Sequence, residues 1–424
     1  MKIATLSIGD ELTLGEIVDT NAAHIAGRLY RDGLRLQRHL TVGDSELDIE
    51  EALELLADKA DAVIATGGLG PTVDDLTARS VAKLTGRRLM LNEEALAHLK
   101  RFTGVENGPL LVLNEKQALL PTKCTVIPNP TGTACGFMVI HNGRFLFFLP
   151  GVPSEMRRML DESVMPFLLE RSRHRRAVGT RVLKTFGLAE AELDDLLKGM
   201  ATPEVSLAFC VSFPEIMVKL RAEGDDGEHL DWVLAQAEAV ARERLRGHVY
   251  GEGDDTIDSV VAGLFRETGQ TLALAESCTG GMIAARITSQ AGSSAWFREG
   301  AVTYSNEAKH RLLGVPPEQI AAHGAVSSET ARAMAKGARQ AAGSDIALAV
   351  TGIAGPDGGT PEKPVGTVFI ALATRSGCHA KGYRFSGGRD EVRTLTSFTA
   401  MDWIRRHLMS QLPPSPAAGT AQPT

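Results

Sequence analysis

The sequence of 424 residues predicts an α/β protein in which two α/β domains flank a small α+β module. Apolar runs of strand length alternate with helical stretches over residues 1–170, and do so again over residues 253–410. Residues 171–252 instead show two helices among three or four strands, in the order βαββα with a possible last strand.

Changes of composition mark where these parts meet. A basic run from Arg171 to Arg176 reads as an exposed linker, and the Gly- and Asp-rich segment from Gly251 to Asp255 marks the second boundary. Residues 411–424 are rich in Pro and small residues, which predicts a disordered tail.

Hydrophobic periodicity predicts the elements of the first domain. Short apolar runs bounded by turn residues predict four strands, namely Lys2–Ile8, Leu34–Val42, Ala62–Thr66 and Arg144–Leu149. Apolar residues at helical spacing predict helices over Asn21–Asp32 and Ser45–Lys59. Ser154 is placed to cap a further helix. Strands separated by helices imply a parallel sheet covered on both faces, and therefore three layers.

The middle module is similar to a small split βαβ or KH-like fold. Its predicted strands are Thr180–Phe186, Ser206–Val211, Glu215–Ala222 and His248–Tyr250. Its predicted helices are Ala189–Lys198 and Leu230–Arg246. The module is dense in acids, which argues against RNA binding and for a spacer or dimerisation role.

The last domain returns to alternating strands and helices. The predicted strands are Thr271–Ala275, Ala301–Tyr304, Ile346–Val350 and Gly366–Thr374. The predicted helices are Ile257–Thr268, Gly280–Thr288, Ser328–Ala342 and Arg389–Met409.

Composition excludes several classes of function. The 45 basic and 52 acidic residues give a net charge of −7, and aromatic residues make up only 5%, which argues against nucleic-acid binding. No apolar stretch has the length of a membrane span, and the first ten residues do not form a secretory signal. The five scattered cysteines contain no CxxC pair, which predicts reduced thiols in a cytoplasm.

The run Thr66–Thr77 predicts a phosphate site at the end of a parallel strand. Gly67, Gly68 and Gly70 allow the backbone to approach a phosphate closely, and the helix that follows points N–H groups at an anion. Asp74 and Asp75 would repel a bare phosphate, so the sequence predicts that they bind a divalent cation such as Mg²⁺ or Mn²⁺. The alternative is an ordinary turn whose aspartates cap a helix.

Three further loops are expected on the same rim. These loops are Gly9–Gly15, Asn129–Ala134 and Leu149–Pro153. Candidate contacts to substrate or metal are Asp10, Glu11, Thr72 and Asn129.

The segment Glu276–Gly281, with the sequence ESCTGG, predicts a second site. Ser277 follows a strand, and Lys309 lies 32 residues later, after the next strand, where the ends of two strands of one sheet can meet. Neither segment contains a His, so a desolvated Lys309 is the candidate base for a Ser277 nucleophile. The backbone N–H groups of Thr279, Gly280 and Gly281 are expected to form an oxyanion hole.

Two alternatives remain open at this site. The segment reads equally as a Ser/Thr-rich helix start that only caps its helix. Cys278 is the rival nucleophile, since a thiol at a helix N-terminus is activated, although it would need His310 or His323 as a partner.

Around this pair, the sequence offers candidates for binding the substrate. Ser294 follows Gly292 and Ser293, while Thr351 and Gly352 close a buried strand, and all three are placed to contact a phosphate or an amide. Arg389 suits bidentate phosphate binding, although it also reads as a solvated helix-start arginine.

Taken in order, these segments resemble the CinA (competence/damage-inducible) family over roughly residues 1–410. The segment Gly9–Glu11 and the run Gly67–Thr72 resemble a molybdopterin-binding fold. The resemblance implies an N-terminal ADP-ribose pyrophosphatase that uses Mg²⁺, Mn²⁺ or Co²⁺ and forms AMP and ribose 5-phosphate. It implies a C-terminal nicotinamide mononucleotide (NMN) deamidase without a cofactor, with Ser277, Lys309 and an assisting Tyr304, and with Ser294, Thr351 and Arg389 at the nucleotide.

The resemblance also implies a homodimer that binds small nucleotides. The competing hypothesis is a molybdopterin-binding or competence-related interaction protein without catalysis, because a fold alone does not carry function. A third possibility keeps one active domain beside a degenerate one. Tyr304 itself reads alternatively as a strand aromatic packed on the core.

Overall fold

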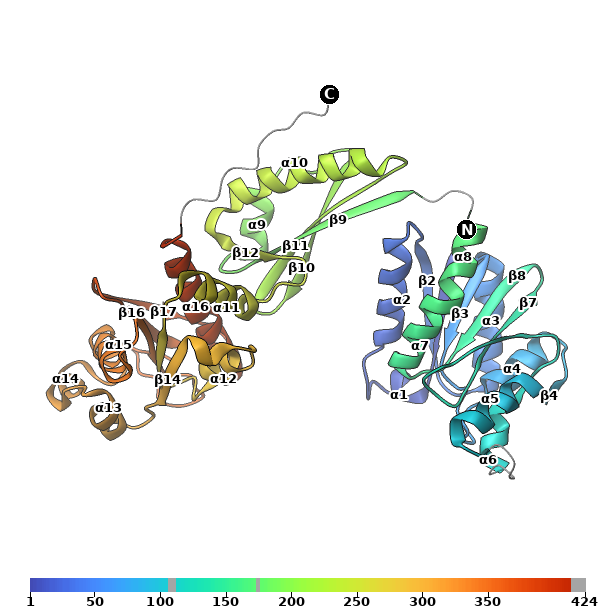
Figure 1. Cartoon of the computed structure of the whole chain (residues 1–424), viewed down its shortest axis with the longest axis horizontal. Coiled ribbons are helices and arrows are strands. Elements are labelled where there is room, and N and C mark those ends of the chain that lie inside the picture. Colours follow the sequence, from blue (N-terminus) through green and yellow to red (C-terminus); the bar gives the residue numbers. More distant parts are fainter. Residues whose placement is uncertain (106–111, 173–175, 413–424) are drawn as a thin grey trace. The chain divides into compact units, whose positions relative to one another are not determined.

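A computed structural model describes residues 1–105, 112–172 and 176–412 (Figure 1). Residues 173–175 of the expected linker and residues 413–424 of the expected tail lie outside the described residues. Contacts divide the chain into two compact units, each described here by itself. The first comprises Met1–Gly179 and Ala222–Trp232, and the second comprises Thr180–Arg221 and Val233–Thr424.

The N-terminal domain is built on a six-stranded mixed sheet in the order β2-β1-β3-β8-β7-β6. Its strands are β1 (Ile3–Ile8), β2 (Leu36–Val42), β3 (Ala62–Thr66), β6 (Thr125–Ile127), β7 (Gly136–His141) and β8 (Arg144–Leu149). A separate two-stranded pair joins β4 (Leu89–Leu91) to β5 (Leu119–Pro121). The helices are α1 (Asp10–Thr13), α2 (Thr20–Arg31), α3 (Glu46–Lys59), α4 (Thr77–Leu84), α5 (Glu93–Thr103), α6 (Val112–Glu115), α7 (Pro153–Met159) and α8 (Met165–Arg171).

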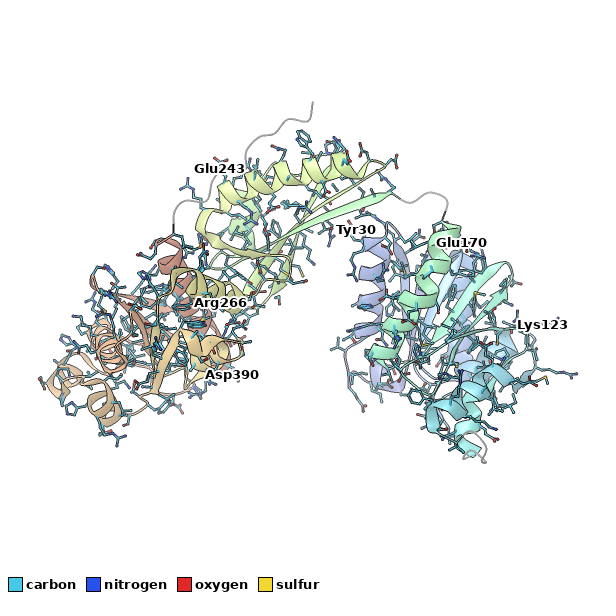
Figure 2. All side chains as sticks on the ribbon, in the orientation of Figure 1. Tyr30, Lys123, Glu170, Glu243, Arg266 and Asp390 are labelled. Atoms are coloured by element: carbon cyan, nitrogen blue, oxygen red, sulfur yellow. The ribbon has the colours of Figure 1, made fainter. Side chains whose placement is uncertain are left out.

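Helices cover both faces of this sheet, which confirms the three layers. Along β3, Val63 and Ala65 pack in one core with α3, while Ala62 and Ile64 pack in another with α2 and α7. Figure 2 draws the side chains on these elements. The alternation follows from the two-residue period of a strand. Because both faces are covered, β3 is apolar at each of these positions.

The expectation of a fully parallel sheet is wrong for two strands. Strands β1, β2, β3 and β8 are parallel, but β7 runs antiparallel to β8, and β6 runs antiparallel to β7. Asn142 and Gly143 form the tight turn between β7 and β8, with φ values of 49° and 75°. An Asn-Gly pair with positive φ at both positions is the typical hairpin signal, so the sequence carried this information. Ser154 does not cap α7, because the helix already begins at Pro153 with Val152 in the cap position.

The middle module is a four-stranded antiparallel sheet in the order β10-β11-β9-β12. Its strands are β9 (Ala177–Thr185), β10 (Val205–Ser212), β11 (Glu215–Gly224) and β12 (Val249–Glu252). Its helices are α9 (Glu190–Leu196) and α10 (Gly227–Leu245). This agrees with the predicted KH-like α+β pattern.

The C-terminal domain has a five-stranded sheet in the order β14-β13-β15-β16-β17. Its strands are β13 (Leu272–Glu276), β14 (Phe297–Val302), β15 (Ile346–Gly352), β16 (Thr367–Ala373) and β17 (Cys378–Arg384). Its helices are α11 (Ile257–Thr268), α12 (Met282–Thr288), α13 (Asn306–Leu313), α14 (Pro317–His323), α15 (Ser328–Ala342) and α16 (Arg389–Met409). Strands β13, β14 and β15 are parallel, whereas β16 and β17 are antiparallel to their neighbours.

Two faces of this sheet are buried against different helices. On β15, Ala347 and Ala349 pack toward α15, while Leu348 and Val350 pack toward α11 and α16. None of the helices in the described part of the chain is both long and apolar enough to cross a bilayer.

Candidate active sites

The first site is a polar pocket of about 420 Å³ at the carboxyl edge of the N-terminal sheet. The loops after β1, β2, β3 and β8 all reach this edge, because those four strands run in the same direction. Loop residues Gly9, Asp44, Gly68, Thr133 and Val152 are among its lining. The predicted rim loops therefore meet at one edge of the sheet, together with the Asp44 loop, which was not among them.

Several carboxylates gather at this pocket. Burial raises the pKa of Asp44, and the nearby charges of Asp10, Glu11 and Asp74 raise it further. Glu11, Asp44 and Asp74 line the pocket. Asp10 and Asp44 are joined by two hydrogen bonds, because the backbone N–H of each residue donates to the carboxylate of the other. Asp44 follows β2 and precedes α3, a position that reads in sequence as an ordinary helix start.

Asp75 lines the pocket together with Asp74 and also stabilises the loop between β3 and α4. Its carboxylate accepts hydrogen bonds from the N–H of Gly70 at 2.7 Å and from the N–H and hydroxyl of Thr72 at 2.8 and 2.6 Å. The expectation that Asp74 and Asp75 both bind a metal stays a prediction. The Gly70 amide and the Thr72 hydroxyl, which were expected at a phosphate, already donate to Asp75.

Gly67 and Gly68 explain why the loop needs glycine. Their φ values are 108° and 65°, and a Cβ on Gly67 would lie 2.1 Å from the carbonyl oxygen of Ile8. The main chain therefore lies tightly against the end of β1.

Asn129 is also a structural residue and is fully buried. Its amide nitrogen donates to the carbonyl of Ala134 at 2.8 Å and to Glu155 at 2.7 Å, and its oxygen accepts from Thr131. Asn129, which was expected to contact the substrate, therefore stabilises the 129–134 loop through these hydrogen bonds. Glu155, which was not a predicted site residue, accepts a hydrogen bond from Asn129 and lines the pocket.

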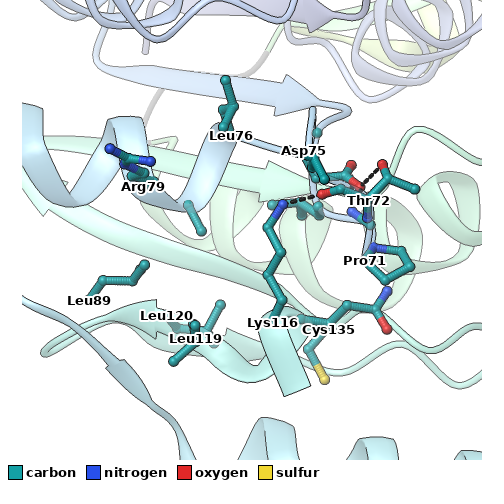
Figure 3. Close-up of a pocket in the computed structure, with 16 residues that line it drawn as sticks. Pro71, Thr72, Asp75, Leu76, Arg79, Leu89, Lys116, Leu119, Leu120 and Cys135 are labelled. Atoms are coloured by element: carbon teal, nitrogen blue, oxygen red, sulfur yellow. Dashed lines mark hydrogen bonds between the residues drawn. The ribbon is translucent and has the colours of Figure 1, made fainter. Parts of the chain in front are cut away.

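A second, largely apolar pocket of about 320 Å³ adjoins the first, and both are lined by the Gly68–Pro71 segment (Figure 3). The apolar part of its lining includes Leu76, Leu89, Leu119 and Leu120. Lys116 stands at its edge and donates a hydrogen bond to the carbonyl of Thr72. Taken together, the two pockets offer an acidic compartment and an apolar compartment side by side.

The second site forms where β13, β14 and β15 end together. Ser277 directly follows β13 and is 8% exposed. Gly280 and Gly281 have φ values of 60° and 95°, so neither is helical, and α12 begins at Met282 instead of the predicted Gly280. The chain therefore makes a sharp turn between Ser277 and the helix, which only glycine adopts readily.

Glu276 organises this turn, and the sequence did not reveal its role. The carboxylate is 1% exposed and accepts the N–H groups of Gly281, Ile283 and Ala284 at 2.8–3.1 Å. An acidic side chain thus satisfies the first amides of α12, where the helix dipole favours a negative charge. The expected oxyanion hole is corrected accordingly, because the Gly281 amide is occupied and the Gly280 amide donates to the Ser277 carbonyl.

The amides of Cys278 and Thr279 remain as the candidate oxyanion donors. Neither N–H donates to an oxygen of the residues that the structure describes. The Thr279 hydroxyl is fully buried and likewise has no hydrogen-bond partner among them.

Lys309 reaches Ser277 from helix α13. Ser305 caps this helix by accepting the N–H of Ala308, and Lys309 one turn later points inward with 1% exposure. Its Nζ lies 3.1 Å from the Ser277 Oγ, 2.9 Å from the Thr303 carbonyl and 3.4 Å from the Tyr304 carbonyl. Burial lowers the pKa of Lys309, since it removes water that would solvate the ammonium.

The three partners of Lys309 suit an uncharged amine. Carbonyl oxygens only accept, so both amine hydrogens can point at Thr303 and Tyr304. In the neutral form the lone pair would face the Ser277 hydroxyl as an acceptor, whereas an ammonium donates to the same oxygen. Among the described residues no carboxylate pairs with this Nζ, so no ion pair holds its proton.

Cys278 is buried and unreactive in this setting. Burial raises the pKa of its thiol to about 12. The rival thiol mechanism also needs a histidine, but the His310 ring nitrogen is bonded to the Val315 carbonyl at 3.0 Å. The geometry therefore favours Ser277 as the nucleophile.

Tyr304 and Arg389 meet at the mouth of this site. Tyr304 lies beyond the end of β14, is 63% exposed, and its hydroxyl accepts from Arg389 at 3.2 Å. Arg389 also donates to the carbonyl of Gly355 at 2.6 Å. The strand predicted to include Tyr304 thus ends too early, and no hydrogen bond among the described residues joins its hydroxyl to Ser277.

Arg393, one helical turn after Arg389, is a further cation at the site. It donates to the Thr279 carbonyl at 3.1 Å. The i, i+4 spacing on α16 was the available signal for this residue. Arg389 and Arg393 together put two positive charges beside the turn that carries Ser277.

Thr351 lies at the expected edge, but Ser294 does not. Thr351 lies on β15, two residues after Ala349, and Ala349 pairs with Ala275 of β13. The Thr351 hydroxyl donates a hydrogen bond to the Ala325 carbonyl. Gly352 ends the same strand. Ser294 precedes β14, so it lies at the amino edge of the sheet, a strand length away from Ser277. Its predicted place at the nucleotide is therefore not supported within this chain.

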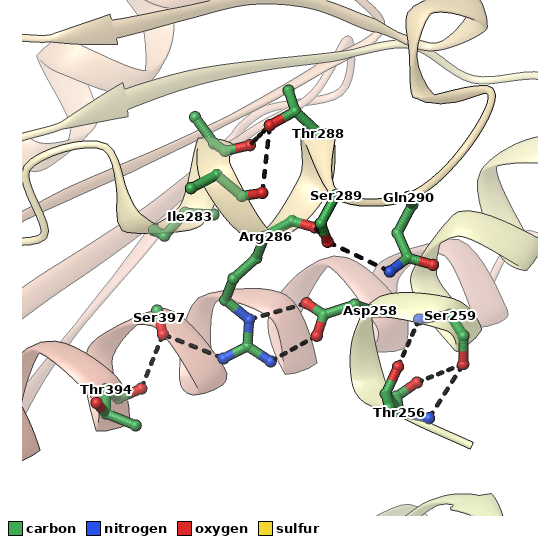
Figure 4. Close-up of polar contacts among 12 residues, drawn as sticks. Thr256, Asp258, Ser259, Ile283, Arg286, Thr288, Ser289, Gln290, Thr394 and Ser397 are labelled. Atoms are coloured by element: carbon green, nitrogen blue, oxygen red, sulfur yellow. Dashed lines mark hydrogen bonds and ion pairs between the residues drawn. The ribbon is translucent and has the colours of Figure 1, made fainter. Parts of the chain in front are cut away.

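A polar network fixes helix α12, which follows the turn that carries Ser277 (Figure 4). Arg286 forms a bidentate ion pair with Asp258 of α11, with its Nε 2.8 Å and its Nη2 3.0 Å from the two carboxylate oxygens. Its third nitrogen donates to Ser397 of α16 at 3.3 Å, and its guanidinium lies 4.7 Å from the Phe398 ring. One side chain thus ties together three helices on the same face of the sheet.

We expect Glu276→Gln to lower both activity and stability. The amide keeps one acceptor oxygen but places an NH₂ group against buried N–H donors, which costs about 1–3 kcal/mol of unfolding free energy. Thermal unfolding and amidase assays measure the two effects. The exposed Glu299→Gln on β14 is the matched control, and equal behaviour of both variants would contradict this role.

Fold and sites together define an α/β protein with a molybdopterin-binding-like domain, a KH-like sheet and a C-terminal domain that carries a Ser–Lys pair. Three family models match in this order. Residues 4–170 match a probable molybdopterin binding domain, residues 180–251 the damage-inducible protein CinA KH domain, and residues 254–408 the CinA C-terminal domain. The chain belongs to the CinA family, which confirms the resemblance.

Full-length relatives support this membership. A CinA-like protein of Geotalea uraniireducens is 63% identical over 97% of this chain and 98% of its own length. A putative competence-damage inducible protein of Acetivibrio thermocellus is 41% identical over 96% and 99%. A solved CinA of unknown function from Thermoplasma acidophilum is 35% identical, with a TM-score of 0.37, and covers 40% of this chain and 97% of its own. A solved Agrobacterium tumefaciens competence/damage inducible protein is 43% identical, with a TM-score of 0.35, over 36% and 95%.

Proposed function

We propose that the chain is a bifunctional hydrolase of pyridine-nucleotide salvage. Its C-terminal domain would convert NMN to nicotinic acid mononucleotide and ammonia. Its N-terminal domain would split ADP-ribose to AMP and ribose 5-phosphate with a divalent metal. The observation that carries the first activity is the buried, desolvated Lys309 with its Nζ 3.1 Å from the Ser277 Oγ.

In the first half-reaction, neutral Lys309 takes the proton of the Ser277 hydroxyl while the Oγ attacks the carboxamide carbon. The negative charge on the carboxamide oxygen would be stabilised by the Cys278 and Thr279 amides. Collapse of this intermediate breaks the C–N bond, and the Lys309 ammonium returns its proton to the leaving amine. Ammonia leaves, and the acyl group remains as an ester on Ser277.

The second half-reaction consumes water. Lys309, again neutral, takes a proton from a water that attacks the ester carbon. The Ser277 oxygen leaves and recovers its proton from Lys309. The sum of both halves is amide plus water giving acid plus ammonia, with the protein unchanged.

Two cations support a phosphorylated substrate. Arg389 and Arg393 stand one turn apart and contact the Gly355 and Thr279 carbonyls, which places them beside the turn that carries Ser277. A guanidinium binds phosphate in a bidentate manner. Tyr304 would then position Arg389 at the mouth, a different role from the proton relay expected for it.

The acidic pocket supports the second activity. Glu11, Asp44 and Asp74 offer the hard oxygen donors that Mg²⁺ and Mn²⁺ prefer. Among the described residues no three such side chains already converge at metal-ligand spacing, so these donors would have to be completed by the substrate's phosphates or by water. A bound divalent cation would neutralise the diphosphate and activate a water. The adjacent apolar pocket suits an adenine ring.

A direct test is to incubate the purified chain with NMN alone and, separately, with ADP-ribose plus Mg²⁺, Mn²⁺ or Co²⁺, and to identify products by mass spectrometry. We expect ammonia from the first and AMP from the second. Absence of both products would overturn the proposal and favour an interaction protein. The expected homodimer stays a prediction, which light scattering tests.

We expect Asp44→Asn and Asp74→Asn each to reduce ADP-ribose hydrolysis by about a hundredfold or more and to leave NMN deamidation unchanged. Each variant should also weaken Mn²⁺ binding measured by calorimetry with the metal alone. The exposed Asp58→Asn on α3 is the matched control.

The metal-free Asp44→Asn variant should be more stable than the wild type. A carboxyl group whose pKa is higher in the folded state than in the unfolded state destabilises the fold when the pH is above its unfolded-state pKa. The neutral amide of asparagine removes that penalty. A metal-free Asp44→Asn variant that unfolds at a lower temperature at neutral pH would contradict the electrostatic assignment of this pocket.

A further inference from the structure

A cavity of about 570 Å³ lies within the second unit, where the middle module meets the C-terminal domain, and no activity derived above uses it. The loop after β9, including Leu188, lines one side of this cavity together with Pro214 at the β10–β11 turn. Strand β17 and helix α16 line the other side. Small-molecule sites commonly occupy such domain interfaces, with volumes of about 300–1,000 Å³.

The two sides of the cavity are held in fixed relation by a buried junction. Phe186 and Tyr250 of the middle module pack on Phe398 of α16, with ring centroids 4.8 and 6.0 Å apart. Arg405 of α16 is 2% exposed and donates to the Gly247 carbonyl at 2.7 Å. The cavity is therefore a permanent part of this unit.

Aromatic rings line its C-terminal side. Tyr383 and Phe385 are two residues apart at the end of the edge strand β17, so they share one face, and their rings are stacked 5.5 Å apart. Trp403 donates its indole N–H to the Tyr383 hydroxyl at 2.7 Å. These rings offer a flat π-surface on which another planar ring can stack.

Positive charge exceeds negative charge at the same place. Asp402 is the acidic residue of the lining, and it is already paired with both Arg405 and Arg406, at 2.7 and 2.6 Å. Lys381 lies above the Tyr383 ring, 5.2 Å from its centroid, on the same face of β17. Arg405 does not line the cavity, so the lining itself has two cations, Lys381 and Arg406, against the single acid Asp402. The ring of His248 adds a nitrogen donor or acceptor at the rim.

We propose that this cavity binds a nucleotide, with the base stacked among Tyr383, Phe385 and Trp403 and the phosphate held by Lys381 and Arg406. The site is separate from the Ser277 turn. Arg389 and Trp403 are 14 residues apart on the same helix, which is about 21 Å along its axis. Helix α16 thus connects the nucleotide cavity to the two arginines of the amidase site.

The test is a titration of the full chain with AMP, GMP, CMP, UMP and NMN, followed by calorimetry and by tryptophan fluorescence. At least one nucleotide should bind and change the fluorescence, because a base stacks beside Trp403. The matching nucleoside and ribose 5-phosphate should each bind at least about tenfold more weakly than the nucleotide, since stacking and charge are both required.

Variants localise the binding. Lys381→Glu should weaken it by about tenfold or more, whereas Lys336→Glu, the same charge change on the exposed side of α15, should not change it. Trp403→Phe should retain calorimetric binding but lose the fluorescence change, and the other two tryptophans of the chain remain as an internal reference. Absence of binding by all five nucleotides, equal affinity in Lys381→Glu, or a fluorescence change that persists in Trp403→Phe would each overturn the proposal.

Discussion

Replacing Ser277 by alanine should reduce NMN deamidation by a factor on the order of 10³ or more. The variant retains Lys309, the Glu276 cap and the cations, but it lacks the atom that forms the acyl ester. Among the described residues no other hydroxyl is bonded to the Lys309 Nζ, whose remaining partners are the carbonyls of Thr303 and Tyr304. Release of ammonia from NMN, followed over time, measures the loss.

The neighbouring Cys278→Ala variant is the matched control. Its thiol has a pKa raised to about 12 by burial, so it is not a nucleophile near neutral pH. We expect Cys278→Ala to lose less than about tenfold in rate, the equivalent of 1.4 kcal/mol. The opposite pattern, with Ser277→Ala active and Cys278→Ala inactive, would reverse the assignment. Thermal unfolding of both variants guards against a loss of fold.

Replacing Lys309 should have the second-largest effect. Lys309→Met keeps the length of the side chain but removes the base, so kcat should fall by about 10²–10⁴-fold. Lys309→Arg keeps a long basic side chain with hydrogen-bond donors, yet a guanidinium does not give up its proton in proteins. Because the proposed role needs a neutral amine, we expect Lys309→Arg to be as inactive as Lys309→Met.

The pH dependence gives this prediction a direction. Burial lowers the pKa of Lys309 below its ordinary value of 10.5, and only the neutral form accepts the Ser277 proton. Activity should therefore rise as the pH increases through this lowered pKa and be lost on its acid side. A rate that is independent of pH up to about 10, or an active Lys309→Arg variant, would show that Lys309 is not the base.

Local patterning was sufficient for much of the fold. The strands Ala62–Thr66 and Arg144–Leu149 were predicted with the bounds that the structure has, because a buried strand reads as a continuous apolar run. The reversal at β7 was missed although the Asn142-Gly143 turn encodes it locally. The helix start at Met282 was misplaced because two glycines in left-handed conformation separate it from Ser277.

The sequence predicted which residues lie at the two sites better than it predicted what each of them does. Gly67, Ser277 and Lys309 stand where the order of strands places them, at the carboxyl edges of the two sheets. Asp75, Thr72 and Asn129 were named as ligands, yet each stabilises a loop, since hydrogen bonds within a turn are not visible in sequence. Asp44 and Glu276 carry no local signal that separates them from ordinary helix-start acids.

By itself, the sequence determined the order of the domains, the family and the residues available for nucleophilic attack, because short-range periodicity and motif spacing encode them. Only the tertiary structure decided which of those residues is reactive. Lys309 lies 32 positions from Ser277, and its pKa is lowered because α13 carries it out of water to a point between two carbonyls. Desolvation depends on everything that surrounds a group in space, and no window of sequence contains that information.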